Sequence, residues 1–120
     1  MSKLTVYQYP KCGTCRSAVK WLQEAGHELE LHHIVDAPPS AAELGRLVEL
    51  SGLPLKKFFN TAGEVYRSLG LKDKLPGLSP EQQLELLASN GKLIKRPIVT
   101  DGKRVTVGFK QEDFSSVWGR

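Results

Sequence analysis

The sequence has little sulfur and no long apolar stretch. It contains two cysteines and one methionine among 120 residues. No apolar run approaches the length of a membrane-spanning helix, and Met1-Ser2-Lys3 leads into the first predicted strand without a secretory apolar region. We therefore expect a cytoplasmic protein without membrane contact, in a compartment whose reductants keep idle thiols reduced.

Internal repeats, linkers and low-complexity stretches are also lacking, which predicts a single domain over residues 1–120. This length can bury a core without support from a metal or a disulfide. The formal net charge is only +4, and no basic arm of the kind that binds nucleic acid is visible. We expect a monomer that does not bind nucleic acid directly.

The two cysteines form the motif Cys12-Gly13-Thr14-Cys15 directly after an apolar run. Leu4–Tyr9 predicts a strand, and the apolar spacing from about residue 14 to 25 predicts a helix that ends at Gly26. A Cys-x-x-Cys motif in a strand-to-helix turn is typical of redox chemistry in a βαβ setting. The helix N-terminus would lower the pKa of Cys12, which we predict to be the nucleophile.

Other interpretations of the cysteine pair stay open. A zinc site would need two more ligands from His27, His32 and His33, and adjacent histidines on a strand point to opposite faces. The thiols could instead be inert core residues, or a permanent disulfide, although so short a loop constrains the unfolded chain little. We predict a reversible Cys12–Cys15 disulfide and no metal site.

The remaining pattern predicts a mixed α/β fold. After the first strand and helix we expect a strand at 29–35, a helix opened by a capping box at Ser40–Glu43 and ended by Gly52, short helices within 54–71 broken near 60–63, a helix from Ser79 to Asn90, a hairpin at 98–107 and a closing helix at 111–118. This order, β-α-β, then helices, then β-β-α, predicts a thioredoxin-like domain with a mixed sheet and a helical insertion at approximately 40–91.

Three motifs, taken in this order, resemble one known family. They are Tyr9-Pro10-Lys11-Cys12-Gly13-Thr14-Cys15-Arg16, Arg96-Pro97-Ile98 and Gly108-Phe109-Lys110. They are similar to motifs of the arsenate reductase-like (ArsC) proteins, specifically the Spx/MgsR branch, and the resemblance covers essentially the whole chain. It implies a thioredoxin-like fold with an inserted helical subdomain.

The resemblance also implies roles for individual residues. Cys12 corresponds to the catalytic cysteine, Arg96 to an arginine facing it, and Pro97 to a proline that follows a cis peptide bond. A guanidinium can hold a thiolate or an oxyanion with its fork of donors. Without the resemblance, the sequence favours a surface salt bridge for Arg96 and an edge-strand position for Pro97. The supporting or substrate-binding candidates are Gly13, Thr14, Arg16, Pro97 and Lys110.

The sequence departs from the glutaredoxin-dependent arsenate reductases at three places. Those enzymes carry a serine at the position of Cys15. They also carry an arginine in the segment that reads Phe58-Phe59-Asn60-Thr61 here, and another near the position of Lys110. A site that lacks two of three bidentate forks would bind a tetrahedral oxyanion weakly.

We therefore predict a thiol–disulfide oxidoreductase with Cys12, Cys15 and Arg96 as catalytic residues. It would bind no cofactor, would use glutathione, thioredoxin or glutaredoxin as electron donor, and would act on a thiol/disulfide substrate or a redox protein. One alternative is an Spx-like redox-sensing regulator that binds RNA polymerase. Another is a glutathione/glutaredoxin-dependent arsenate reductase, and a third is a metal-binding or other non-redox binding module.

Overall fold

The computed structural model describes residues 3–119, and the chain divides into two compact units. The first unit consists of the residues up to His33 and from Arg96 onward, and the second runs from Ile34 to Lys95. The organisation of both units as a single domain with a helical insertion at approximately 40–91 stays a prediction. No helix in the described part of the chain is both long and apolar enough to span a membrane.

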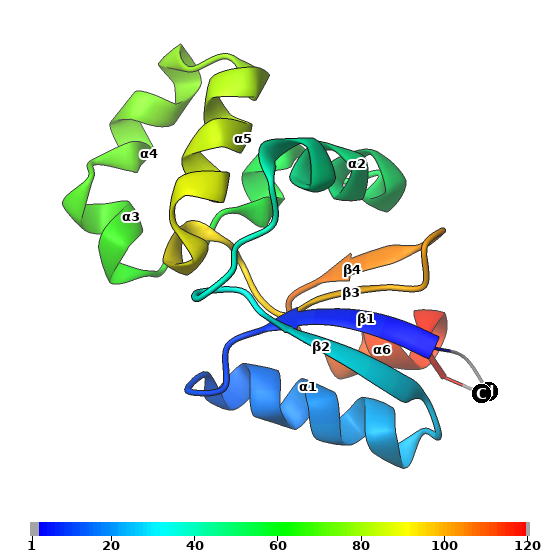
Figure 1. Cartoon of the computed structure of the whole chain (residues 1–120). Helices are drawn as coiled ribbons and strands as arrows, with labels where there is room; N and C mark the ends of the chain where they lie inside the picture. Colours follow the sequence, from blue (N-terminus) through cyan, green and yellow to red (C-terminus); the bar gives the residue numbers. More distant parts are fainter. Residues whose placement is uncertain (1–2, 120) are drawn as a thin grey trace. The chain divides into compact units, whose positions relative to one another are not determined.

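The first unit contains a four-stranded sheet in the order β2-β1-β3-β4 (Figure 1). β1 (Lys3–Gln8) pairs in parallel with β2 (Glu28–His33), and α1 (Gly13–Glu24) is the crossover between them. β1 also pairs antiparallel with β3 (Ile98–Thr100), which forms a hairpin with β4 (Val105–Val107). The predicted mixed sheet and late hairpin are confirmed.

α1 and α6 (Gln111–Val117) cover one face of this sheet (Figure 1). Alternation along β1 turns Leu4 and Val6 toward the helices, where both are fully buried. The helices contribute apolar side chains at three- and four-residue spacing. The rings of Trp21 and Phe114 meet edge-on, with their centroids 5.5 Å apart. The core of this unit consists of Leu4, Val6, Ala18, Leu22, Val99, Phe114 and Trp118.

The strand directions bring three loops to one edge of the sheet. Tyr7 pairs with Ile98, and Ile98 pairs with Val107, so the end of β1, the start of β3 and the end of β4 lie together. We call this edge, with residues 9–16, 96–97 and 108–110, the thiol edge. The opposite edge, with His27, the hairpin turn at 101–104 and Trp118, is the anchor edge.

The second unit is helical. Its elements are α2 (Ala41–Ser51), α3 (Glu64–Ser68), α4 (Leu71–Lys74), α5 (Pro80–Ser89) and the 3-10 turns η1 (Leu55–Phe58), η2 (Leu75–Gly77) and η3 (Gly91–Leu93). α5 begins at the predicted Ser79, which forms a capping box with Gln82. At α2 the Ser40 hydroxyl accepts from the Glu43 N–H, but the Glu43 carboxylate pairs with Arg46 at 2.7 Å.

The two ends of the helical unit meet at Gly91. A Cβ at this position would lie 1.9 Å from the Ile34 carbonyl oxygen, so only glycine permits the approach. A short antiparallel bridge between Phe59 and Ile94 follows, flanked by a hydrogen bond of 2.8 Å from the Lys95 N–H to the Phe58 carbonyl. This bridge joins the middle of the helical unit to its end.

Two predicted boundaries are wrong. The second strand ends at His33 rather than at Val35, because its partner β1 ends at Gln8, which is opposite His33. The short helices predicted to end at Leu71 continue through α4 and η2 to Gly77. Leu71 and Leu75 are both buried, but Pro76 and Gly77 obscure their helical spacing in the sequence.

Candidate active site

Cys12 occupies the N-cap position of α1, as the sequence predicts. Its N–H donates to the Tyr9 carbonyl at 2.9 Å, and its Sγ accepts from the Cys15 N–H at 3.4 Å. The thiol therefore receives one of the backbone N–H groups that a helix start leaves without a partner in the helix. The turn from strand to helix places the sulfur at the positive end of the helix dipole.

The two thiols differ in exposure. Cys12 is partly exposed, whereas Cys15, one turn into α1, has no accessible surface, and neither is in a disulfide in this structure. The difference follows from helical geometry, because Cys15 lies on the face of α1 that also buries Ala18 and Leu22. An external reactant therefore reaches Cys12 first.

The pKa of the Cys12 thiol is lowered from its ordinary value. Partial burial acts against ionisation, but it is outweighed by hydrogen bonds from the backbone and the side chain of Cys15, by the positive charge of Arg96 and by the Thr14 backbone. These groups all stabilise the thiolate. Cys12 is thus the acidic member of the pair.

The pKa of Cys15 moves in the other direction. Burial is the largest cause and raises it, a hydrogen bond from the Tyr9 backbone and the charge of Arg96 lower it, and the neighbouring Cys12 raises it further, to about 12. Cys15 is therefore a protonated thiol at neutral pH. The pKa values of the two thiols therefore shift in opposite directions.

Arg96 and Pro97 precede β3 at the thiol edge. The Arg96–Pro97 peptide bond is cis, as the resemblance implies. The Arg96 guanidinium lies 5.3 Å from the centroid of the Tyr9 ring, and its charge lowers the pKa of both thiols. The Pro97 carbonyl accepts from the Gly108 N–H at 2.9 Å, which ties the start of β3 to the end of β4.

Tyr9 is a site residue to which sequence reasoning assigned no role. Its carbonyl accepts from the Cys12 N–H, its backbone reaches the Cys15 thiol, and its ring supports Arg96. The ring of His33 lies edge-on to the Tyr9 ring, with the two ring centroids 5.6 Å apart. The only signal in the sequence was an aromatic residue just ahead of the motif.

The supporting candidates have different positions. The Arg16 guanidinium donates to the Pro10 carbonyl at 2.9 Å and so closes the loop that carries Cys12. Gly13 and Thr14 are exposed in the first turn of α1. Lys110 is exposed at the start of α6, on the thiol edge, and its role as a substrate contact stays a prediction.

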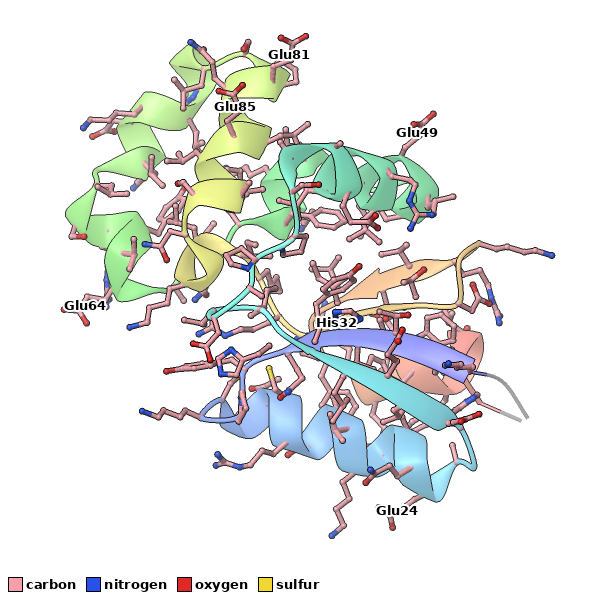
Figure 2. The ribbon with its side chains drawn as sticks, in the orientation of Figure 1. Glu24, His32, Glu49, Glu64, Glu81 and Glu85 are labelled. Carbon is pink, nitrogen blue, oxygen red and sulfur yellow. The ribbon has the colours of Figure 1, made fainter. Side chains whose placement is uncertain are left out.

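The residues considered as metal ligands have other contacts. The His32 ring packs against the Tyr7 ring, with the two ring centroids 5.2 Å apart. A ring nitrogen of His27 donates a hydrogen bond to the Trp118 carbonyl. Within residues 3–119, no group of three or more histidine, cysteine, aspartate or glutamate side chains is placed to hold a metal ion. Figure 2 labels His32, which lies on β2, and its ring nitrogen is 3.6 Å from the Glu30 carboxylate.

Known proteins resemble this chain over nearly its whole length. It is 61% identical over 115 residues to the uncharacterized protein YusI of Bacillus subtilis, which covers 96% of this chain and 98% of YusI. It is 28% identical over 110 residues to the global transcriptional regulator Spx of Streptococcus agalactiae, with coverage of 92% and 79%. It is 29% identical over 107 residues to the regulatory protein MgsR of B. subtilis, with coverage of 89% and 83%.

Two solved structures share its fold. A putative ArsC family related protein from Bacteroides fragilis has a TM-score of 0.90 and 50% identity, with coverage of 94% of this chain and 95% of that chain. A possible arsenate reductase from Streptococcus mutans has a TM-score of 0.84 and 45% identity, with coverage of 96% and 99%. The predicted thioredoxin-like α/β fold is thereby confirmed. Residues 7–117 match the ArsC family, and this chain belongs to it.

Proposed function

We propose that the protein is a thiol–disulfide oxidoreductase in which Cys12 attacks and Cys15 resolves. The observation that supports this most strongly is the opposite shift of the two pKa values within one helix turn. A partly exposed, acidic thiol can attack, while a buried, protonated one is held back until a disulfide forms beside it. The assignment requires no bound cofactor.

In the first step, the Cys12 thiolate attacks one sulfur of the substrate disulfide. The substrate S–S bond breaks, and its second sulfur leaves as a thiolate that takes a proton from water. Arg96 and the helix N-terminus stabilise the attacking thiolate, which increases the fraction of ionised Cys12 near neutral pH. The product is a mixed disulfide between Cys12 and the substrate.

In the second step, Cys15 attacks the Cys12 sulfur. The hydrogen bond and the negative charge of Cys12 both contribute to the high pKa of Cys15, and formation of the mixed disulfide removes that charge. The pKa of Cys15 then falls, although burial still holds it high. Cys15 loses its proton to water, the bond to the substrate breaks, and the second substrate thiol leaves with a proton.

The cycle transfers two electrons from the thiol pair to the substrate and leaves a Cys12–Cys15 disulfide. A thiol donor such as glutathione, thioredoxin or glutaredoxin would return the electrons. Because burial restrains ionisation of Cys15, we expect the resolving step to limit the rate.

Intact mass after alkylation tests this proposal. Mild oxidation should remove both free thiols from the monomer without forming a dimer, and a reductant should restore both. The Cys15→Ser variant, as the matched control, should lose its single thiol only through dimers or adducts. Oxidation of the wild type that gives dimers alone, or no change, would contradict an internal redox pair.

A second candidate is a redox-sensing transcriptional regulator, favoured by the names of the relatives Spx and MgsR. In this proposal the same thiol pair is a switch, and its output is binding to RNA polymerase. Polymerase capture by the oxidised and reduced wild type, with Cys12→Ser as control, separates the two candidates. Redox-dependent capture without disulfide turnover would favour the regulator, and turnover without capture would favour the enzyme.

A further inference from the structure

The helical unit contains a cavity with a marked excess of positive charge. Its volume is about 320 Å³, and it is lined by Pro54, Lys56, Lys57, Phe59, Thr61 and Lys95. Small-molecule sites start at roughly this size, about 300 Å³. The cavity lies outside the thiol site, and none of its residues has a role in the proposed thiol exchange.

Local folding brings the three lysines together. Lys56 and Lys57 belong to η1, while Lys95 follows η3, far along the chain. The bridge between Phe59 and Ile94 and the hydrogen bond from the Lys95 N–H to the Phe58 carbonyl align these segments. Lys95 is thereby fixed beside the turn that carries the other two lysines.

No negative charge of the described chain balances these lysines. None of the lining residues is acidic, and among residues 3–119 no ion pair engages the side chain of Lys56, Lys57 or Lys95. The labelled carboxylates Glu64 and Glu81 of the same unit project outward (Figure 2). Like charges around one cavity repel each other, so the arrangement favours an anion inside it.

A second cavity of the helical unit is also lined by lysines. It has a volume of about 150 Å³, shares Lys56 with the first cavity and adds Lys72 beside the apolar side chains of Leu75 and Pro76. The Tyr66 ring also lines it.

We propose that the lysine cavity binds a small phosphorylated ligand that carries at least two negative charges. Three ammonium groups exceed the charge of a single carboxylate, and lysines hold phosphate oxygens as mobile point charges. The Thr61 hydroxyl, in the same lining, can donate one further hydrogen bond. This site goes beyond the proposed thiol chemistry and is independent of it.

Pyrophosphate is the probe for this site, titrated at constant ionic strength by calorimetry and by amide chemical shifts. We expect saturable binding, with the largest shifts at residues 54–61 and 95. The Lys57→Gln/Lys95→Gln double variant should weaken binding about tenfold or more, as the loss of charge-assisted hydrogen bonds requires. Lys57 and Lys95 are exposed, so this variant should keep the wild-type fold, as circular dichroism can verify.

The matched control is Lys20→Gln/Lys103→Gln, which removes the same charge from exposed positions of the first unit. It should change the affinity less than twofold. Equal losses in both double variants would mean that only net charge matters, and would overturn the proposal. It would also be overturned by the absence of saturable binding at millimolar pyrophosphate, or by shifts centred on Cys12 and Arg96.

Discussion

At the anchor edge of the sheet, an arginine holds the fold together, while at the thiol edge an arginine acts on sulfur. Arg104 donates to Asp101 at 3.0 Å and to the Val117 carbonyl at 2.8 Å, and it lies 5.0 Å from the centroid of the Trp118 ring. Arg96 likewise lies over an aromatic ring, that of Tyr9, but its charge lowers the pKa of both thiols.

The contrast extends to the neighbours of each arginine. Trp118 donates from its indole to Thr106 at 2.9 Å, and its carbonyl accepts a hydrogen bond from His27, so the end of α6 is tied to both the hairpin and the start of β2. The thiol edge instead contains an exposed first helix turn and a partly exposed thiol. Of these two arginine–aromatic pairs in one unit, the pair at the anchor edge holds the fold together, and in the proposed function the pair at the thiol edge supports reactivity.

The largest effect should come from the cysteines. Cys12→Ser should reduce turnover of a glutathione mixed disulfide to background, because the attacking sulfur is gone, while Cys15→Ser should accumulate the mixed disulfide. Reductase assays and intact mass measure the two outcomes. Turnover that survives in Cys12→Ser would place the chemistry elsewhere. Neither change should alter folding as strongly as a change at the anchor edge.

The next effect concerns which substrate the protein accepts. The resemblance to the arsenate reductases implies that those enzymes carry arginines at the positions of Asn60 and Lys110, and neither residue offers a charged bidentate fork. Each missing charged hydrogen bond costs about 1.5–3 kcal/mol, so arsenate reduction should be roughly a hundredfold or more less efficient than it would be with both forks.

Steady-state assays with arsenate and with a glutathione mixed disulfide, coupled to glutathione and glutaredoxin, measure this preference. We expect the disulfide to be the better substrate. Lys110→Arg should raise arsenate turnover more than disulfide turnover, because only a guanidinium offers an oxyanion a bidentate fork. Robust arsenate reduction without disulfide reductase activity would contradict the preference.

The two arginines can be compared directly. Arg96→Gln removes a charge that lowers the pKa of Cys12, so the alkylation rate of Cys12 near neutral pH should fall. Arg104→Gln should leave that rate unchanged and lower the free energy of unfolding by on the order of 1 kcal/mol. Alkylation kinetics and urea titrations of both variants measure this. Loss of stability alone in Arg96→Gln would remove the distinction between the edges.

These comparisons also show what the sequence can predict. The helix starts near Cys12 and at Ser79 depend on residues within a few positions, and both could be predicted. The stacking of Tyr9 under Arg96 and the hydrogen bond between His27 and Trp118 join residues far apart in the chain. Local patterns carry no information about such pairs, and the lysine cavity was missed for the same reason.

A smaller effect on folding stability is expected at acid pH. The pKa of Asp101 is below its ordinary value, because hydrogen bonds from the backbones of Arg104 and Lys103, together with the Arg104 side chain, outweigh its partial burial. Its contribution to stability is therefore present above the unfolded-state pKa and is lost as the pH falls through the folded-state pKa. In Asp101→Asn, the unfolding temperature should fall less steeply as the pH is lowered than in the wild type. The same pH dependence in both proteins would contradict this role of Asp101.

The pH dependence of alkylation at each thiol, followed by peptide mass spectrometry, tests the central claim most directly. We predict that Cys12 reacts with an apparent pKa below the ordinary cysteine value, while Cys15 stays largely unmodified until the solution is strongly alkaline, in keeping with a pKa of about 12. Equal alkylation rates of the two thiols at about pH 6, or faster modification of Cys15, would contradict the assignment of Cys12 as the nucleophile.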